Sequence, residues 1–456
     1  MSEQIAAIRR SGFLRAVWLL VGGASFAHAI TALTLPILTR LYTPLDFSVL
    51  AVFTGVVATV AVAACLRFDV AIPLPDDDRG AINVLALALI ACLVISALIA
   101  LVLAVLRAAA IDLGQPALTP FMWLVPVGVF LMGAFSALQN WFIRRKGFGS
   151  IAAARIGQST AASVGQVALG VAGAGPLGLI AGQILNSGAG CVGLLVRFLR
   201  ADFALLQSVD LQGLTSAWRR YQRFPRLSAM EALANSAGMQ VPIIMIAALA
   251  VGADAGFLSL AMFVMQAPMG LIGNAVSQVY VSRAADSLRN GQLAPLTANV
   301  LGGLFRSGVG PLIFAGIVSP DVFQVIFGHE WRRAGELVTW MTPWFVLQFL
   351  ATPISMVLHV KGRLGSALLL QIGGLVLRVT AVYVVAMISA QHVAEAYSVS
   401  GFAFYACCLA VAVRVSGLAV RDLFKGFRTG LPTVAGWIIA GLVVRLLGSA
   451  VSHLTA

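Results

Sequence analysis

The sequence predicts an all-α, polytopic membrane protein with two six-helix lobes in the same orientation around a central cleft. Of its 456 residues, 60% are hydrophobic and only 10% are charged, whereas about 25% of the residues of a soluble domain are charged. Its apolar runs are about 20 to 25 residues long, enough to cross a hydrocarbon core of about 30 Å as helices. Strand-like alternation is missing from these runs, which argues against a barrel.

Twelve apolar runs are predicted to be transmembrane helices, and a thirteenth follows them. The first run comes after Arg9, Arg10 and Arg15. It is longer than the apolar core of a signal peptide, about 7 to 15 residues, so we expect it to remain as a membrane helix. The predicted spans are roughly 14–38, 47–66, 82–106, 119–142, 151–173, 176–199, 227–250, 255–279, 297–319, 336–359, 364–388 and 396–416, and the thirteenth run is 431–450.

The longest hydrophilic segment, residues 200–226, divides the chain after six spans and before six more. Leu211, Leu214, Trp218 and Tyr221 recur in it at helical spacing beside arginines, which is typical of a helix lying in the membrane interface. We therefore expect an N-terminal lobe at 1–199, a cytoplasmic amphipathic connector at 200–226, a C-terminal lobe at 227–416, and a tail at 417–456 that holds the candidate thirteenth helix.

A short internal similarity supports two repeats. The second and eighth spans open with Phe47-Ser-Val-Leu-Ala51 and Ala255-Gly-Phe-Leu-Ser259, and an acidic residue, Asp46 or Asp254, precedes each. Six spans per half with a cytoplasmic connector place both lobes in the same orientation, as in several transporters. The cleft between the lobes is then the expected transport route.

The basic residues predict the orientation of the chain. Most of the 30 Lys and Arg residues lie in alternate loops on the side of the N-terminus, and the opposite side has only Arg40, Arg107, Arg332 and Arg333. Because cytoplasmic loops carry the excess of Lys and Arg, the N-terminus is predicted to be cytoplasmic. Such loops facing anionic lipid account for the formal charge of +13, so we expect no nucleic-acid partner.

Ionisable side chains inside the predicted spans are candidate functional residues, because each costs about 3 kcal/mol there and usually faces a cavity or a partner. Arg306 and Arg378 lie deep in their spans, where snorkelling to the surface is difficult. Arg155 and Glu231 lie about one and a half turns from a cytoplasmic end, so snorkelling is the alternative for them. Glu231 is the one acidic residue inside a span, which makes it a candidate for ion coupling.

Uncharged polar residues also occur inside the spans. His28 and Gln240 have comparable depths in the first and seventh spans, which indicates that both helices face the cleft, although a packed histidine is the alternative. Amides such as Asn140 are too numerous for a purely lipid-facing bundle. Either a water-filled cavity or interhelical hydrogen bonds would explain them.

Motifs of catalysis and cofactor binding are missing from the sequence. It contains no Walker A loop, no His-Glu-x-x-His, no Gly-x-Ser-x-Gly and no dinucleotide fingerprint, so we expect neither an enzyme nor a cofactor. The five cysteines lie in apolar runs without metal-ligand spacing, so no metal site is expected. They are predicted to be small core residues: Cys65, Cys92, Cys191, Cys407 and Cys408.

Three stretches resemble the polysaccharide transporters of the multidrug/oligosaccharidyl-lipid/polysaccharide flippase superfamily, which include the bacterial O-antigen and related repeat-unit flippases. They are Leu38-Thr-Arg-Leu-Tyr-Thr-Pro-Leu-Asp-Phe47, Leu66-Arg-Phe-Asp-Val-Ala-Ile-Pro-Leu-Pro75 and Phe327-Gly-His-Glu-Trp-Arg-Arg-Ala-Gly335. The resemblance covers most of residues 10–416, and the thirteenth apolar run departs from the usual twelve spans.

The resemblance implies a flippase of the bacterial cytoplasmic (inner) membrane. Such a protein moves an undecaprenyl-diphosphate-linked oligosaccharide from the inner to the outer leaflet by alternating access, for O-antigen, capsule or exopolysaccharide synthesis. The implied partners are this lipid-linked oligosaccharide and membrane lipids, with a glycan polymerase, other assembly proteins and a proton or sodium gradient as further candidates. The alternatives are a lipid II flippase of the same superfamily, a multidrug or cation antiporter, and a membrane polymerase or ligase.

Arg67 and Asp69 lie at the predicted cytoplasmic mouth, where the second span ends. Residues two apart on a helix do not face each other, so they are not expected to pair. Arg67 is a candidate for meeting the diphosphate and Asp69 for bridging to an arginine of the other lobe as a gate latch; the alternative is an ordinary membrane-edge charge pair. The turn at 76–78 is expected to be solvated.

The substrate-binding candidates are thus Arg67, Arg155, Arg306, Arg378, His28, Asn140 and Gln240, and the gating or ion-coupling candidates are Asp69 and Glu231.

Overall fold

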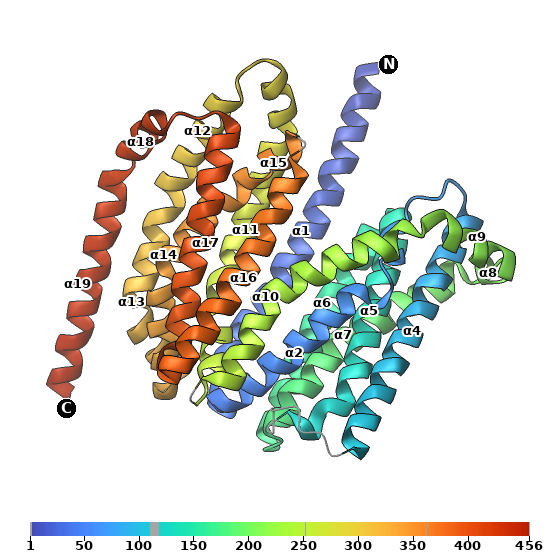
Figure 1. The fold of residues 1–456 in the computed structure, drawn as a ribbon, viewed down its shortest axis with the longest axis horizontal. Helices are drawn as coiled ribbons and strands as arrows, with labels where there is room; N and C mark the ends of the chain where they lie inside the picture. Colours follow the sequence, from blue (N-terminus) through green and yellow to red (C-terminus); the bar gives the residue numbers. More distant parts are fainter. Residues whose placement is uncertain (1, 110–117, 251, 362, 456) are drawn as a thin grey trace. The chain divides into compact units, whose positions relative to one another are not determined.

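The computed structural model describes residues 2–109, 118–250, 252–361 and 363–455, and these residues form helices and no strands (Figure 1). A helix occupies each of the twelve predicted spans and the thirteenth apolar run. Among the described residues, ten helical segments are long and apolar enough to cross a membrane, or eleven if the bent pair Arg421–Arg428 and Leu431–Leu447 is one span. The predicted all-α membrane fold is therefore confirmed.

The chain divides into two compact units, Met1–Gln240 and Val241–Ala456. In the first unit, α5 packs against α2, α4 and α7, while α6 packs against α1 and α7. The elements of this unit are α1 (Ser2–Leu41), α2 (Pro44–Ala64), α3 (Phe68–Ala71), α4 (Asp78–Ala108), η1 (Thr119–Leu124), α5 (Val125–Arg144), α6 (Phe148–Val171), α7 (Pro176–Ala201), α8 (Phe203–Leu206), α9 (Leu211–Tyr221) and η2 (Phe224–Ser228).

The second unit repeats part of this packing. Its α14 packs against α11, α13 and α17, α16 packs against α17, and α19, the thirteenth run, packs along α13. The boundary between the units falls inside α10 (Ala229–Leu249). The remaining elements are α11 (Asp254–Arg289), α12 (Leu293–Leu304), η3 (Phe305–Val309), α13 (Gly310–Phe327), η4 (His329–Trp331), α14 (Arg332–Ser355), α15 (Val357–Val360), α16 (Leu364–Ile388), η5 (Ala390–His392), α17 (Val393–Ser416), α18 (Val420–Arg428) and α19 (Leu431–Thr455).

The cysteines are free thiols. Cys65, Cys92 and Cys191 are buried as predicted, but Cys407 is exposed on α17. An apolar run predicts that a residue lies in a membrane helix, but not which side of the helix it lies on. Because a membrane helix also has a lipid-facing side, the prediction that Cys407 is a core residue was wrong.

Candidate functional site

A sharp corner separates α2 from α3 in the first unit. Leu66 and Arg67 have positive φ angles of 48° and 63°, although neither is glycine. Left-handed backbone costs such residues roughly 1–2 kcal/mol each, so packing must hold the corner in place. It directs Phe68 and Asp69 inward, with exposed fractions of 0% and 5%. The Nε of Arg67 is also buried, and it has no hydrogen-bond partner among the described residues.

Asp69 is anchored to α5. Ser136 Oγ donates a hydrogen bond of 2.7 Å to Asp69 Oδ2. Asn140 Nδ2 in turn donates to the Ser136 carbonyl at 3.0 Å. Asp69 Oδ1 is buried and has no partner in the described part of the chain. Among the described residues, the hydrogen-bond partner of Asp69 is thus a serine of its own unit. No Arg67–Asp69 ion pair forms among the described residues.

Arg155 on α6 reaches the same part of α5. Its Nη2 donates to Gln139 Oε1 at 2.9 Å, and its guanidinium lies 5.2 Å from the centre of the Phe135 ring. The Arg155 side chain is otherwise exposed. The structure therefore brings Asp69, Asn140 and Arg155 around one stretch of α5.

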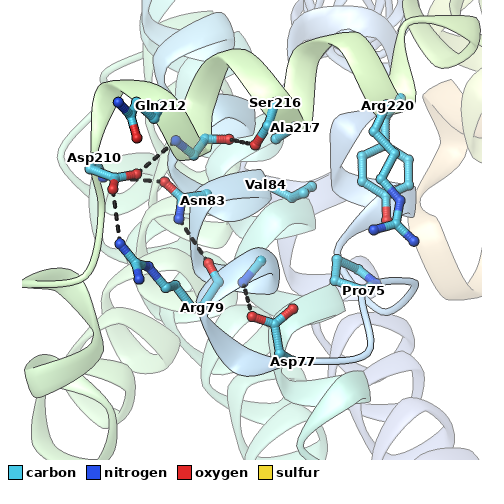
Figure 2. Close-up of a pocket in the computed structure, with 13 residues that line it drawn as sticks. Pro75, Asp77, Arg79, Asn83, Val84, Asp210, Gln212, Ser216, Ala217 and Arg220 are labelled. Carbon is cyan, nitrogen blue, oxygen red and sulfur yellow. Dashed lines mark hydrogen bonds and ion pairs between the residues drawn. The ribbon is translucent and has the colours of Figure 1, made fainter.

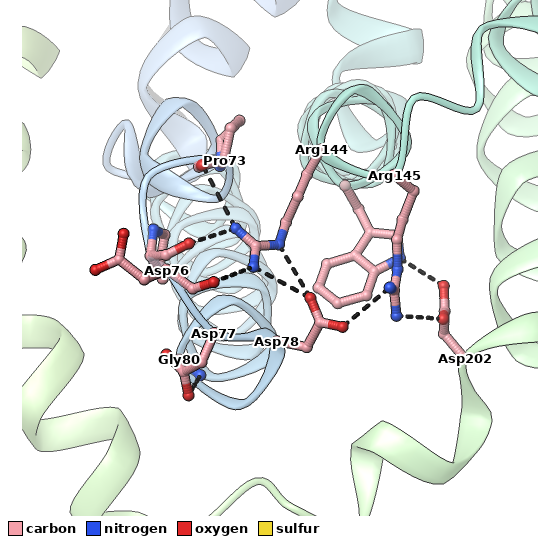
Figure 3. A network of polar contacts seen from close by, with 10 residues as sticks. Pro73, Asp76, Asp77, Asp78, Gly80, Arg144, Arg145 and Asp202 are labelled. Atoms are coloured by element: carbon pink, nitrogen blue, oxygen red, sulfur yellow. Dashed lines mark hydrogen bonds and ion pairs between the residues drawn. The ribbon is translucent and has the colours of Figure 1, made fainter.

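The turn before α4 is an ion-pair network (Figure 3). Asp77 caps α4 by accepting a bond of 3.1 Å from the Gly80 amide. Asp78 pairs with Arg144 at 3.1 Å and with Arg145 at 3.0 Å, at the end of α5. Arg145 continues the network to Asp202 at 2.7 Å, and Asp202 also accepts from the indole of Trp141. Asp76 and Asp77 are exposed, as a solvated turn requires, whereas Asp78 is partly covered by its two ion pairs. Sequence spacing does not predict these pairs, because it does not show that α5 ends beside Asp78.

The connector helix α9 packs on the start of α4, and a polar pocket of about 460 Å³ lies between them (Figure 2). Arg79 pairs with Asp210 across this pocket at 2.9 Å. Asp210 also caps α9 by accepting a 2.7 Å bond from the Gly213 amide. This amide, and then Arg79, lower the pKa of Asp210 from its ordinary value. Farther along α9, the Trp218 ring lies 5.4 Å from the Phe68 ring, so the connector also touches the α2–α3 corner.

Arg378, in the second unit, lies in an aromatic cage that we define by Trp344, Phe404 and Tyr405. Its guanidinium is 4.5 Å from the centre of the Phe404 ring, 5.7 Å from Trp344 and 5.8 Å from Tyr405. Arg378 is only 7% exposed, and its Nε is buried with no hydrogen-bond partner among the described residues. Two further polar atoms on α14, Trp344 Nε1 and Gln348 Oε1, are buried and unpaired in the same sense.

Among the described residues, no hydrogen bond or ion pair links the other predicted site residues to the clusters of their own unit. Arg306 is exposed on the π-helical segment η3, and its Nε donates to the Gly302 carbonyl at 3.3 Å. His28 is exposed on α1, and Gln240 is half-buried on α10. Glu231 is exposed in the first turn of α10.

Sequence reasoning missed the residues that surround Arg378. Trp344 and Gln348 are four residues apart, so one face of α14 carries both, which is a signal that the sequence does contain. Nothing in the sequence indicates that this face of α14 packs beside Phe404 and Tyr405 on α17. Reasoning from the sequence also missed a second cluster, in which Arg333 on α14 pairs with Asp254 and Glu395.

Comparisons with known proteins agree with the all-helical membrane fold. A sequence model described as "Polysaccharide biosynthesis protein" matches residues 37–336, and a search of curated proteins gives no match. Among solved structures, the lipid II flippase MurJ in an inward closed conformation is similar, with a TM-score of 0.66, 13% identity, and coverage of 96% of this chain and 99% of that one.

A multidrug resistance MATE family transporter of the MOP superfamily, in its inward-facing conformation, has a TM-score of 0.54 and 14% identity, with 87% of this chain and 94% of that one covered. Both relatives are transporters, and at such low identity they show the fold alone. The family match covers more than half of the sequence. The chain therefore belongs to the polysaccharide biosynthesis protein family, with the membrane fold of the MurJ and MATE transporters.

Proposed function

We propose that the protein is a flippase that moves an undecaprenyl-diphosphate-linked oligosaccharide from the inner to the outer leaflet of the bacterial cytoplasmic membrane, for surface polysaccharide synthesis. The family description supports a role in polysaccharide synthesis, and the fold of flippases and transporters supports movement across a membrane. The N-terminus is cytoplasmic in this proposal, in agreement with the distribution of Lys and Arg.

The observation that carries the proposal is the environment of Arg378. A guanidinium buried among membrane-spanning helices is costly unless it is paired. Three aromatic rings offset part of this cost through cation–π attraction. They do not satisfy the Arg378 Nε, the Trp344 Nε1 or the Gln348 Oε1. Two unpaired donors, Arg378 Nε and Trp344 Nε1, beside aromatic faces are suited to a diphosphate and the hydroxyl groups of sugars.

The other residues singled out in the sequence remain candidates for gating or for binding the substrate, and the structure favours some of them over others. Asp69 is favoured over Glu231 for gating, because Asp69 is buried with an unpaired oxygen at a strained corner whereas Glu231 is exposed. Arg67, with its buried and unpaired Nε, is favoured as a cargo contact near that corner. Arg155, Arg306, His28, Asn140 and Gln240 remain proposed substrate contacts.

Lipid II is the alternative cargo, because the similar solved structure is named as a lipid II flippase. Both cargoes require a transporter and no catalytic group. The two candidate cargoes are distinguished by supplying each lipid to the purified protein and measuring its transfer between leaflets.

The proposal is tested in a strain that lacks the protein and receives Arg378→Gln, Arg378→Lys or wild type. A charge-assisted hydrogen bond contributes about 1.5–3 kcal/mol, so Arg378→Gln should lower surface polysaccharide by about tenfold or more at equal protein level in the membrane. Arg378→Lys should recover only part of it, because an ammonium lacks the planar fork. The matched control is Arg421→Gln, which removes an exposed arginine on α18. Normal polysaccharide with Arg378→Gln would refute the role of Arg378.

A further inference from the structure

Arg333 joins the starts of three helices in the second unit. It lies in the first turn of α14, and its Nε is 3.5 Å from Asp254 Oδ1, at the first residue of α11. Its Nη2 donates a short hydrogen bond to Glu395 Oε1, in the first turn of α17. Two carboxylates on different helices thus share one guanidinium, at the end that the sequence predicts to be external.

The charges around this cluster do not balance. Glu336 lies 3.7 Å from Arg333 and 3.8 Å from Arg332. Arg332 pairs with Asp321 on α13 at 3.0 Å. His392 of η5 lines the same cavity as Glu395. Carboxylates therefore outnumber guanidiniums, and the buried part of the network has two carboxylates for one arginine.

Burial makes this excess negative charge costly. Asp254 is 6% exposed and Glu395 is 9% exposed, whereas the side chain of Glu336 is 44% exposed. Glu395 Oε2 is buried and has no hydrogen-bond partner among the described residues. Burial disfavours the charged form of a carboxyl group, so one proton on a pair of buried carboxylates that share a guanidinium removes the excess charge.

We propose that Asp254, Arg333 and Glu395 form a proton-binding site that latches the start of α11 to α14. Asp254 is the member that takes the proton, because its contact with Arg333 is the longer one and the Arg333–Glu395 hydrogen bond can persist without it. A neutral Asp254 is no longer attracted to Arg333, so the first turn of α11 is released. The Arg333–Glu395 pair then remains balanced and continues to join α14 to α17.

The first repeat supplies a natural comparison. Asp46 precedes the second span as Asp254 precedes the eighth, but Asp46 accepts bonds of 2.8 Å from the Thr43 amide and hydroxyl in a capping box. It is a local cap of α2. Asp46→Asn is therefore a matched control that changes an aspartate at the corresponding position without touching the latch.

Hydrogen exchange in the whole detergent-solubilised protein tests the proposal. The amides of residues 255–258 are compared at about pH 5 and about pH 7.5, after correction for intrinsic exchange rates. In the wild type, protection should be lower by about two- to fivefold at the acidic pH, because the proton removes one ionic contact of α11. Asp46→Asn should behave as the wild type does.

Two variants give opposite predictions. Asp254→Asn mimics the bound proton, so residues 255–258 should exchange fast at both pH values. Glu395→Gln leaves Asp254 as the buried partner of Arg333, so protection should persist at both. The proposal is overturned if the wild type shows equal protection at the two pH values, or if Glu395→Gln keeps the wild-type pH dependence. The Glu395→Gln result tests the proton-binding latch even if Asp254→Asn does not fold.

Discussion

Ser136 on α5 donates a 2.7 Å hydrogen bond to Asp69, just beyond the left-handed Leu66 and Arg67. This bond ties the α2–α3 corner to α5. On the other side of the corner, Phe68 packs against Trp218 of the connector helix. A polar bond and an aromatic contact, both within the first unit, thus help to hold a strained segment in place.

Removing the hydroxyl of Ser136 should destabilise the first unit. Ser136→Ala leaves the buried carboxylate of Asp69 without its hydrogen bond, which costs about 1–3 kcal/mol. The midpoint of thermal unfolding in detergent should fall. Ser307→Ala is the control, because the Ser307 hydroxyl is exposed and bonds to its own helix at Gly303. Equal midpoints for Ser136→Ala and the control would show that the bond does not hold the corner.

The ion-pair network of α4 and α5 should contribute less to the stability of the first unit than the Ser136–Asp69 hydrogen bond does. Asp78→Asn weakens two pairs with Arg144 and Arg145, and since Asp78 is 41% exposed, each pair is expected to contribute only about 0.2–1 kcal/mol. The loss in thermal stability should shrink as salt is added. Asp76→Asn, at an exposed neighbour, should change nothing. A salt-independent loss would mean that Asp78 acts as something other than an ion-pair partner.

The connector helix should be sensitive to acid. The pKa of Asp210 is lowered by its cap bond from Gly213 and by Arg79, so the stabilisation is present at neutral pH and is lost as the pH falls through that lowered pKa. Because an unfolded aspartate titrates near about pH 4, the amides of α9 should lose exchange protection only below that value. Asp210→Asn keeps a capping oxygen but cannot titrate. Acid sensitivity that survives in this variant would contradict the assignment.

The length of the apolar runs was enough to predict the membrane helices, because the hydrophobic effect and the thickness of the bilayer act on each segment separately. Because this reasoning treats each segment separately, it did not predict contacts between residues of different helices. Asp78 and Arg144 are far apart in sequence, and only the packing of α4 on α5 brings them together. Depth in a span correctly singled out Arg378 as unusual, but the rings around it come from two other helices.

The two arginines predicted to be deep show the limit of reasoning from depth. Arg378 is caged and buried, whereas Arg306 lies on an exposed surface of a π-helical segment. Depth gives the position along a helix. It does not give the face of the helix, which depends on which neighbours pack beside it.

The packing of α16 on α17 near Arg378 requires a residue without a side chain at position 374. A Cβ atom on Gly374 would collide with the ring of Phe404, one wall of the cage. Gly374→Ala should therefore destabilise the second unit by about 1–3 kcal/mol. The adjacent Gly373 has open space around it, so Gly373→Ala should be neutral or slightly stabilising. Thermal unfolding of both variants checks this, and equal effects would argue against close packing of the cage.

Flipping by the purified protein tests the central claim most directly. Proteoliposomes with the wild type, with Arg378→Gln or without protein receive a fluorescent undecaprenyl-diphosphate-linked oligosaccharide, and a membrane-impermeant quencher reports its transfer between leaflets. A parallel sample contains lipid II. The account predicts that the wild type transfers the oligosaccharide lipid at least about tenfold faster than Arg378→Gln does, since one charge-assisted hydrogen bond is lost. Transfer no faster than in liposomes without protein, or transfer of lipid II alone, would contradict it.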